Sequence, residues 1–359
     1  MRRLPLIVLL VGGCAKPVVV ETPAEMSEAL AEVVIPPLPL WTHKYADTVE
    51  EQGVFLRISA VMARYGMTRL DAVEVQNHLR DQRRVDPQGD LQAQLDEAVA
   101  RVRRGDRESG VDPAALAAAR FVVVFDVDET LWDQSYRVER QGPCHDLAVR
   151  DGMEVRYIKT SPHWETAFEA VRGAGGKVAI FSANVDDRTL AGLRAWTWED
   201  RPLTDHPDVL GVFTNSHLVL QDKAEGSRKA PVVEPSKDLR IFDEGLAKVI
   251  LVDDNPWRTF QPTNLRLVAK LDADLMCDAD ADPVAQEARA GELARVAASI
   301  RDAAAWLDAH PEGTFRQAFL PFTWAGSLAV DTVAEATDHD WPAAMDWVRE
   351  HPEVVPPQF

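Results

Sequence analysis

Polar side chains that could bind a metal or a phosphate follow directly after three short apolar runs of the sequence. The polar segments are Asp126-Val127-Asp128-Glu129-Thr130, Ser182-Ala183-Asn184 and Asp253-Asp254-Asn255. Two carboxylates one residue apart point the same way from an extended chain, so Asp126 and Asp128 face one space. With Asp253 or Asp254 opposite, three acidic groups converge, and their repulsion requires a divalent cation. All-oxygen ligands of this kind favour Mg²⁺, bound through carboxylates, water and a substrate phosphate.

A carboxylate beside Mg²⁺ can also attack phosphorus and carry a covalent aspartyl-phosphate. The competing interpretation is that these are surface carboxylates at strand ends, since Asp is frequent in this chain, notably between residues 272 and 282. A D-x-D-x-T segment at the end of a buried strand is much rarer than D-x-D alone. Three strands that end in suitable polar residues, in order along the chain, therefore favour a phosphoryl-transfer site.

The runs that precede the polar segments have the composition of buried strands. Phe121–Phe125, Val178–Phe181 and Val249–Val252 are continuous stretches of aliphatic and aromatic residues. Between the first two, Trp164–Val171 carries apolar residues at helical spacing. Strands that alternate with helices predict an α/β fold with a parallel sheet and helices on both faces. Such sheets bind ligands beyond the carboxyl ends of their strands, where the polar segments lie.

Helical segments flank this region on both sides. The pattern from Tyr45 to Arg120 is helical, with Asp90 as the N-cap of one helix, and it contains no catalytic motif. We predict that it is a helical cap or a packing layer. Beyond Pro283 the chain is rich in alanine and again has helical spacing. The acidic residues from 272 to 282 lack the glycine and terminal glutamate of a calcium loop, which predicts a solvated linker.

Charge and cysteine content exclude several classes of protein. Lys and Arg number 39 and Asp and Glu number 58, which gives a formal net charge of −19. Binding to nucleic acid depends on clustered positive charge, so a general nucleic-acid binder is excluded. Adhesion to anionic lipid through a basic surface is disfavoured for the same reason. The cysteines Cys14, Cys144 and Cys277 are too few and too scattered for a disulfide framework or a structural zinc site.

The N-terminus has the pattern of a secretory signal. Two arginines precede a short apolar run that ends in Val11-Gly12-Gly13-Cys14. The run is far shorter than the ~20 residues needed to span a bilayer. A cysteine directly after two glycines resembles a bacterial lipobox, in which this cysteine is lipidated and becomes the mature N-terminus. The sequence predicts a lipid anchor at Cys14 that holds the protein in the cell envelope, outside the cytoplasm. If the signal is not used, the protein is cytoplasmic.

The first polar segment, with its neighbours, also resembles a known motif. Phe125-Asp126-Val127-Asp128-Glu129-Thr130-Leu131 is similar to motif I of the haloacid dehalogenase (HAD) superfamily. Two further stretches resemble the C-terminal-domain phosphatases, also called the NLI-interacting-factor-like family. These stretches are Asp151 to His163, with its P-H turn, and Lys237-Asp238-Leu239-Arg240 followed by Val249 to Pro256. The resemblance covers residues 119 to about 270 and implies a HAD-like Rossmannoid sheet.

The resemblance implies a catalytic role for four residues. Asp126 would be the nucleophile, and Asp128 would protonate the leaving oxygen and then act as base on the hydrolytic water. Ser182 and Lys237 would hold the phosphoryl oxygens, with Lys237 supplying positive charge. Lys229 competes for the lysine role, and the K-D-L context favours Lys237.

The resemblance also implies the ligands of the metal. Asp126, the backbone carbonyl of Asp128 and Asp254 would hold Mg²⁺, with Asp253 beside them. Thr130 would orient the loop through a hydrogen bond. Whether Asp253 or Asp254 is the direct ligand stays open at this point.

The chain departs from the family pattern at positions that contact substrate. Ser161 stands where the family commonly has an arginine, Phe213-Thr214-Asn215-Ser216 replaces F-R-E-S, and Gln221 to Ser236 resembles an insertion. The expected function is Mg²⁺-dependent hydrolysis of phosphomonoesters, with a phosphoprotein as one possible substrate. The alternatives are a nonspecific acid phosphatase on small phosphomonoesters and a non-catalytic module that binds phosphate groups.

These observations predict five parts of the chain. They are a lipoprotein-type signal (1–14), a linker rich in proline (15–44), a helical N-terminal region (45–118), a HAD-like phosphatase domain (119–275) and a helical C-terminal region (283–359).

Overall fold

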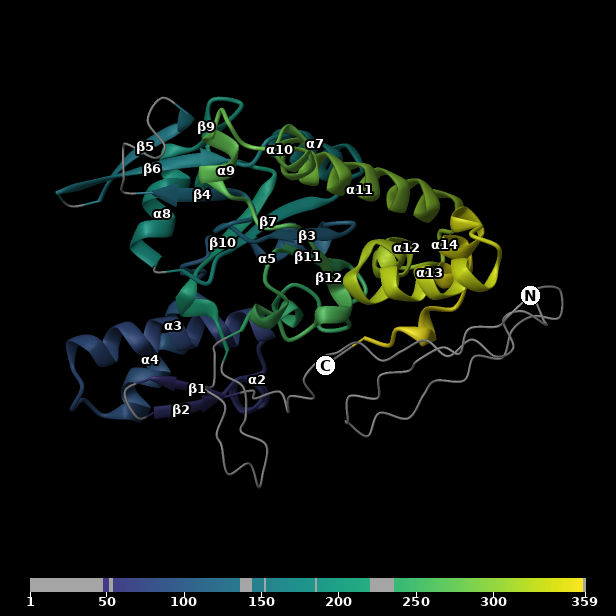
Figure 1. Cartoon of the computed structure of the whole chain (residues 1–359). Coiled ribbons are helices and arrows are strands. Elements are labelled where there is room, and N and C mark those ends of the chain that lie inside the picture. The colour runs from purple at the N-terminus through teal and green to yellow at the C-terminus, as the bar shows by residue number, and fades with distance from the viewer. Residues whose placement is uncertain are drawn as a thin grey trace, which may run out of the picture.

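The computed structural model (Figure 1) describes residues 48–51, 54–135, 144–151, 153–184, 186–219 and 236–357. The expected anchor at Cys14, the competing Lys229 and nearly all of the expected insertion lie outside the described residues. Within those ranges, no helix has the length and apolar character that crossing a membrane requires.

A five-stranded parallel sheet forms the centre of the molecule. In chain order its strands are β3 (Val122–Phe125), β7 (Lys177–Phe181), β10 (Val209–Phe213), β11 (Val249–Asp253) and β12 (Leu265–Leu267). Their order across the sheet is β10-β7-β3-β11-β12. The chain adds strands in one direction from β3 to β10 and in the other from β11 to β12. The neighbours β3 and β11 therefore lie at a topological switch point, where open α/β sheets bind ligands.

Helices cover both faces of the sheet, as the sequence predicts. Alternate residues of β3 point to opposite faces, so Val123 and Phe125 join one hydrophobic cluster while Val122 and Val124 join another. The first cluster is covered by α7 (Trp164–Gly173), α11 (Glu292–Ala309) and α12 (Phe315–Phe319). The second is covered by α2 (Ile58–Tyr65), α3 (Arg69–Val85) and α4 (Leu91–Arg103). Figure 1 shows α7 and α11 on one side of the sheet and α3 and α4 on the other.

The helix predicted after Asp90 is confirmed as α4, and the Asp90 side chain accepts a hydrogen bond from the N–H of Ala93 over 2.7 Å. The acidic linker includes one short helix, and its first and last aspartates, Asp272 and Asp282, are N-caps. The remaining helices are α5 (Pro113–Ala118), α8 (Asp186–Ala195), α9 (Ala273–Cys277), α10 (Pro283–Ala290), α13 (Trp324–Ala336) and α14 (Trp341–Glu350).

The helical pattern expected from Tyr45 is wrong for its first residues. Strands β1 (Thr48–Glu51) and β2 (Val54–Arg57) form an antiparallel pair there. Both segments contain β-branched residues, which favour extended chain. A helix begins only at Ile58.

The chain forms a second, antiparallel sheet after β3. It consists of β4 (Trp132–Ser135), β6 (Glu154–Thr160) and β5 (Leu147–Asp151), in that spatial order. A short antiparallel pair, β8 (Thr197–Trp198) and β9 (Arg201–Pro202), lies further along the chain.

A disulfide joins Cys144, just before β5, to Cys277 at the end of α9. The sequence predicted no disulfide framework, and it gave no sign of this single disulfide between Cys144 and Cys277. They are 133 positions apart in sequence, and only the fold brings their Cα atoms within 5.6 Å.

Candidate active site

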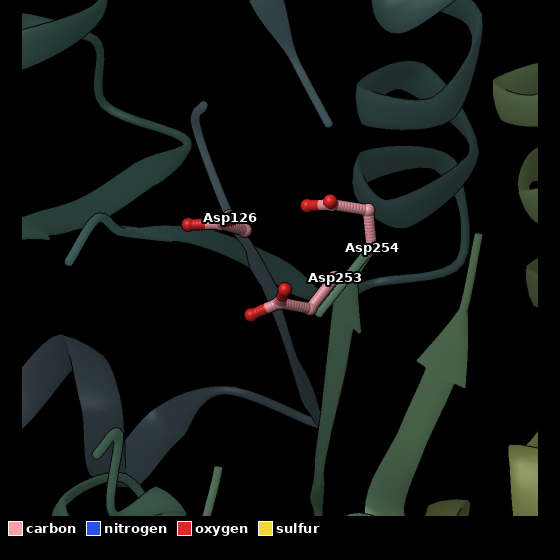
Figure 2. Close-up of side chains that lie close together, drawn as sticks. All are labelled: Asp126, Asp253 and Asp254. Carbon is pink, nitrogen blue, oxygen red and sulfur yellow. The ribbon is translucent and has the colours of Figure 1, made fainter. Parts of the chain in front are cut away.

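The carboxyl ends of β3 and β11 bring three carboxylates together. Val252 pairs with Phe125 across the sheet, so Asp253 and Asp126 follow at the same level. Carboxylate oxygens of Asp126, Asp253 and Asp254 lie within 4.8 Å of one another. Figure 2 shows the carboxyl group of Asp254 turned toward the side of Asp126. The sheet register thus brings Asp126 together with both acidic residues of the third segment, whereas Asp128, which the sequence placed in the same group, is not a member of this cluster.

A buried lysine lies between two of these carboxylates. The Nζ atom of Lys237 is 2.6 Å from Oδ1 of Asp126 and 2.6 Å from Oδ2 of Asp253. The side chain is fully buried, and its backbone exchanges hydrogen bonds with Arg258 and Phe260 just after β11. Because three carboxylates share one lysine, the group keeps an excess of negative charge.

Burial changes the proton affinities of these side chains. Burial and the charge of Asp253 raise the pKa of Asp126 well above its ordinary value, although Lys237 opposes this. Burial and Asp253 also raise the pKa of Asp254 to about 6. For Lys237, burial would lower the pKa, but the charges of Asp126 and Asp253 outweigh it and raise the pKa. Full ionisation of the three carboxylates therefore requires further positive charge.

The three carboxylates differ in how many of their oxygens are free to bind a divalent cation. Asp253 has both oxygens engaged, since Oδ2 contacts Lys237 and Oδ1 accepts a backbone N–H two residues further on. The hydroxyl of Thr130 donates to Oδ1 of Asp254 over 3.1 Å. Among the described residues, no hydrogen bond reaches Oδ2 of Asp254. Asp254 and Asp126 thus have the oxygens that suit Mg²⁺, whereas Asp253 holds the lysine.

The second carboxylate of the D-x-D pair is held by four side-chain donors. Oδ1 of Asp128 accepts from Nε1 of Trp132 over 3.1 Å, from Nε2 of Gln134 over 3.1 Å and from Nδ2 of Asn184 over 3.2 Å. Oδ2 accepts from Oγ of Ser182 over 3.0 Å. Ser182 therefore lies against Asp128 and fixes one of its oxygens.

The turn after Asp128 determines where two of these donors, Trp132 and Gln134, lie. Glu129 has a φ of 64°, a left-handed conformation that non-glycine residues seldom adopt. The N–H groups of the next three residues donate to the carbonyl of Val127 over 2.9 to 3.4 Å, so the chain doubles back. The reversal leads directly into β4, whose first residue, Trp132, contacts Asp128.

The structure arranges the predicted site residues in two groups. One contains Asp126, Asp253, Asp254 and Lys237, and the other contains Asp128 and Ser182. That the backbone carbonyl of Asp128 is a metal ligand stays a prediction. Two further residues that contact Asp128, Trp132 and Gln134, were not predicted as site residues. These two residues are two apart on a strand, and that spacing would have placed them on one face.

Comparisons with known proteins give weak similarities. No family model matches the chain, and no curated protein matches it. One similar solved structure is Fcp1, described as an essential RNA polymerase II CTD phosphatase, with 12% identity over 63% of this chain and 73% of that chain and a TM-score of 0.37. Another is the fission yeast CTD phosphatase Fcp1 bound to beryllium fluoride, with 12% identity over 68% of this chain and 70% of that chain and a TM-score of 0.29. Similarities this low carry no argument about function, which therefore depends on the geometry of the site.

Proposed function

We propose that this protein is a Mg²⁺-dependent phosphomonoester hydrolase that works through an aspartyl-phosphate on Asp126. The observation that carries the proposal is the contact of Asp126 with Lys237, beside Asp254, at the switch point of the sheet. Phosphoryl transfer depends mainly on positioning and on stabilisation of charge. A carboxylate nucleophile, a positive side chain and a pair of cation ligands supply both.

In the first step an oxygen of Asp126 forms a bond to phosphorus while the bond from phosphorus to the leaving oxygen breaks. Lys237 remains charged and donates to a phosphoryl oxygen. Asp126, Asp254 and the backbone carbonyl of Asp128 would hold Mg²⁺, which would supply positive charge beside the phosphoryl oxygens.

Asp128 handles the protons in both steps. It gives a proton to the leaving oxygen and later takes one from the water that hydrolyses the aspartyl-phosphate. Ser182 donates to Asp128 in the structure, and we assign its hydroxyl to a phosphoryl oxygen when substrate is bound.

The substrate is a phosphorylated protein or a small phosphomonoester. Ser161, in place of the family's arginine, is buried, and its N–H donates to the carbonyl of Leu131 over 2.8 Å. This position packs on the loop after Asp128 and offers no charge to a substrate. The position therefore gives no support for an RNA polymerase II CTD as the substrate of this protein.

We also propose that the protein lies outside the cytoplasm, anchored by lipid at Cys14. The disulfide between Cys144 and Cys277 supports this location, because disulfides form and persist in oxidising compartments and are rare in the cytosol.

The test of the activity is hydrolysis of p-nitrophenyl phosphate by the purified full chain with Mg²⁺ or with EDTA. We expect Asp126→Asn to lower the rate by more than about 10³-fold, because an amide cannot form the covalent intermediate. Asp331→Asn, an exposed position on α13, is the matched control and should retain the wild-type rate. A folded Asp126→Asn protein with more than a few per cent of that rate would overturn the assignment of the nucleophile.

A further inference from the structure

A buried arginine in the second sheet determines how Asp128 is held. Arg156 lies on β6, and its side chain is fully buried. Its Nη1 donates to Oε1 of Gln134 on β4 over 2.7 Å, and its Nη2 donates to the backbone carbonyl of Arg188 on α8 over 2.7 Å. Through the guanidinium, the side chain of Gln134 on β4 is connected to β6 and to α8.

The guanidinium also decides which way the amide of Gln134 points. An arginine side chain has donors and no acceptor, so the amide must turn its oxygen toward Arg156 and its NH₂ toward Asp128. Gln134 then donates to Oδ1 of Asp128 over 3.1 Å. Without the arginine, the amide is able to rotate and present its oxygen to the carboxylate, which is a repulsive contact.

Trp132 gives Oδ1 of Asp128 a second donor that cannot be reversed, because an indole N–H only donates. The indole is held in place by its packing. Its ring lies 5.8 Å from that of Trp196, and a Cβ atom at Gly192 would lie only 2.3 Å from it. The close approach of α8 to β4 therefore depends on a glycine at this position.

We propose that Arg156 is a positioning residue for proton transfer: through Gln134 it holds Asp128 so that Oδ2 exchanges the proton with the leaving group. This inference rests on the proposed function. Oδ1 faces three N–H donors, which leave no acceptor for a proton there, whereas Oδ2 contacts the hydroxyl of Ser182, which can donate or accept.

The proton and the bonds balance in this arrangement. In the first step the O–H bond at Oδ2 of Asp128 breaks and the proton joins the leaving oxygen, while phosphorus passes from that oxygen to Asp126. In the second step water bonds to phosphorus, its proton returns to Oδ2, and the bond to Asp126 breaks.

The test compares leaving groups in single-turnover reactions of the full chain with Mg²⁺. Because p-nitrophenolate leaves without a proton and an alkoxide needs one, loss of the positioned acid slows alkyl phosphates selectively. We expect Arg156→Met and Gln134→Met each to slow an alkyl phosphate by about 10²-fold and p-nitrophenyl phosphate by less than about 10-fold, since general acid catalysis contributes ~10²–10⁴-fold. The double variant should be no slower than Gln134→Met, because Arg156 acts through Gln134.

Arg316 provides a matched control. It is also buried and donates to a side-chain amide oxygen, that of Asn264, and to a backbone carbonyl, that of Val355. Arg316→Met therefore removes a comparable set of bonds at a site that does not contact Asp128. We expect it to change both rates by the same factor. Equal slowing of both substrates by Arg156→Met, or multiplied effects in the double variant, would overturn the inference.

A spectroscopic measurement separates this inference from the proposed activity. The indole N–H resonance of Trp132, identified through Trp132→Phe, reports the hydrogen bond to Asp128. We expect it to shift in Arg156→Met and in Gln134→Met, with recovery toward the wild-type position in Arg156→Lys, which restores a donor. An unchanged resonance in Arg156→Met overturns the inference even if the enzyme is active. A shifted resonance in a protein that hydrolyses no phosphomonoester supports the positioning contact and refutes the proposed function. If Arg156→Met does not fold, Gln134→Met alone decides the leaving-group test.

Discussion

At the scale of one residue, the proton affinity of Asp254 would make Mg²⁺ binding depend on pH. Its pKa is raised from 3.8 to about 6 by burial and by Asp253, so the folded metal-free protein holds this proton more tightly than the unfolded chain does. The folded state is therefore favoured below the raised pKa, and the free energy of unfolding falls as pH rises from about 4 to about 6. At 1.36 kcal/mol per pKa unit the full shift corresponds to about 3 kcal/mol, and because Asp254 is only partly buried, screening by solvent makes the loss smaller.

We predict from this that Mg²⁺ stabilises the protein more at pH 7 than at pH 5. The cation binds the ionised carboxylate, and at pH 5 the proton competes for it. Thermal unfolding with Mg²⁺ and with EDTA, at both pH values, measures the effect. Asp254→Asn is the control and should lose most of the Mg²⁺-dependent gain at pH 7. An equal gain in Asp254→Asn would show that the cation binds elsewhere.

The sequence could predict the residues that local motifs carry and no others. Asp126, Asp128 and Asp254 each follow an apolar run, so strand prediction alone places them at one edge. Gln134 and Arg156 meet because β4 pairs with β6 in one particular register, in which Gln134 lies opposite Ile158. Nothing in the local sequence specifies that pairing, so the contact to Asp128 could not be predicted.

At the scale of elements, the buried carboxylate of Glu74 on α3 contacts two other segments of the chain. Glu74 is fully buried on α3, and it accepts the N–H groups of Glu108 and Ser109 over 2.9 and 3.2 Å. Its Oε1 also lies 3.6 Å from Nε2 of His217, in the short helical turn after β10. Although burial alone would raise it, the pKa of Glu74 is lowered by the nearby His217, by the side chain of Ser109 and by the N–H of Glu108. The contacts of this carboxylate therefore stabilise the packing of α3.

We expect Glu74→Ala to lower the free energy of unfolding by about 3 kcal/mol or more, because it leaves buried donors without an acceptor. Glu74→Gln should cost less, since an amide oxygen still accepts. Urea denaturation measures both variants, with Glu97→Ala on the exposed side of α4 as control. A loss below about 1 kcal/mol in Glu74→Ala would mean that this contact does not hold α3 in place.

Strands that are unbroken apolar runs and helices with regular apolar spacing were predictable, and the other elements were not. The buried strands β3, β7 and β11 and the helices α4 and α7 follow their apolar patterns. The edge strands β10 and β12 occupy five and three residues, and β1 and β2 occupy four each. Gly211 interrupts β10, β12 has a central arginine, and β1 and β2 end in charged residues, so none of these strands is an unbroken apolar run.

At the scale of the whole molecule, we propose that the location of the protein depends on Cys14. We predict that Cys14 is the mature N-terminus and carries lipid, so that the protein sediments with membranes after cell lysis. Cys14→Ser should move it to the soluble fraction, while Ser59→Ala, distant in sequence from the signal, should leave it with the membranes. A chain whose intact mass is unmodified and begins at Met1 would contradict both lipidation and export.

The disulfide has a consequence for a chain that a protease has cut. Asp126 and Asp128 lie before Cys144, whereas Ser182, Lys237 and Asp254 lie between Cys144 and Cys277. A single cut between residues 144 and 277 divides the protein into two polypeptides, yet the bridge keeps them covalently joined. The two pieces then meet at an effective concentration that a bimolecular encounter does not reach. After a cut between residues 144 and 254, the bridge holds the piece with Asp126 to the piece with Asp254, and reduction of the bridge removes this covalent link.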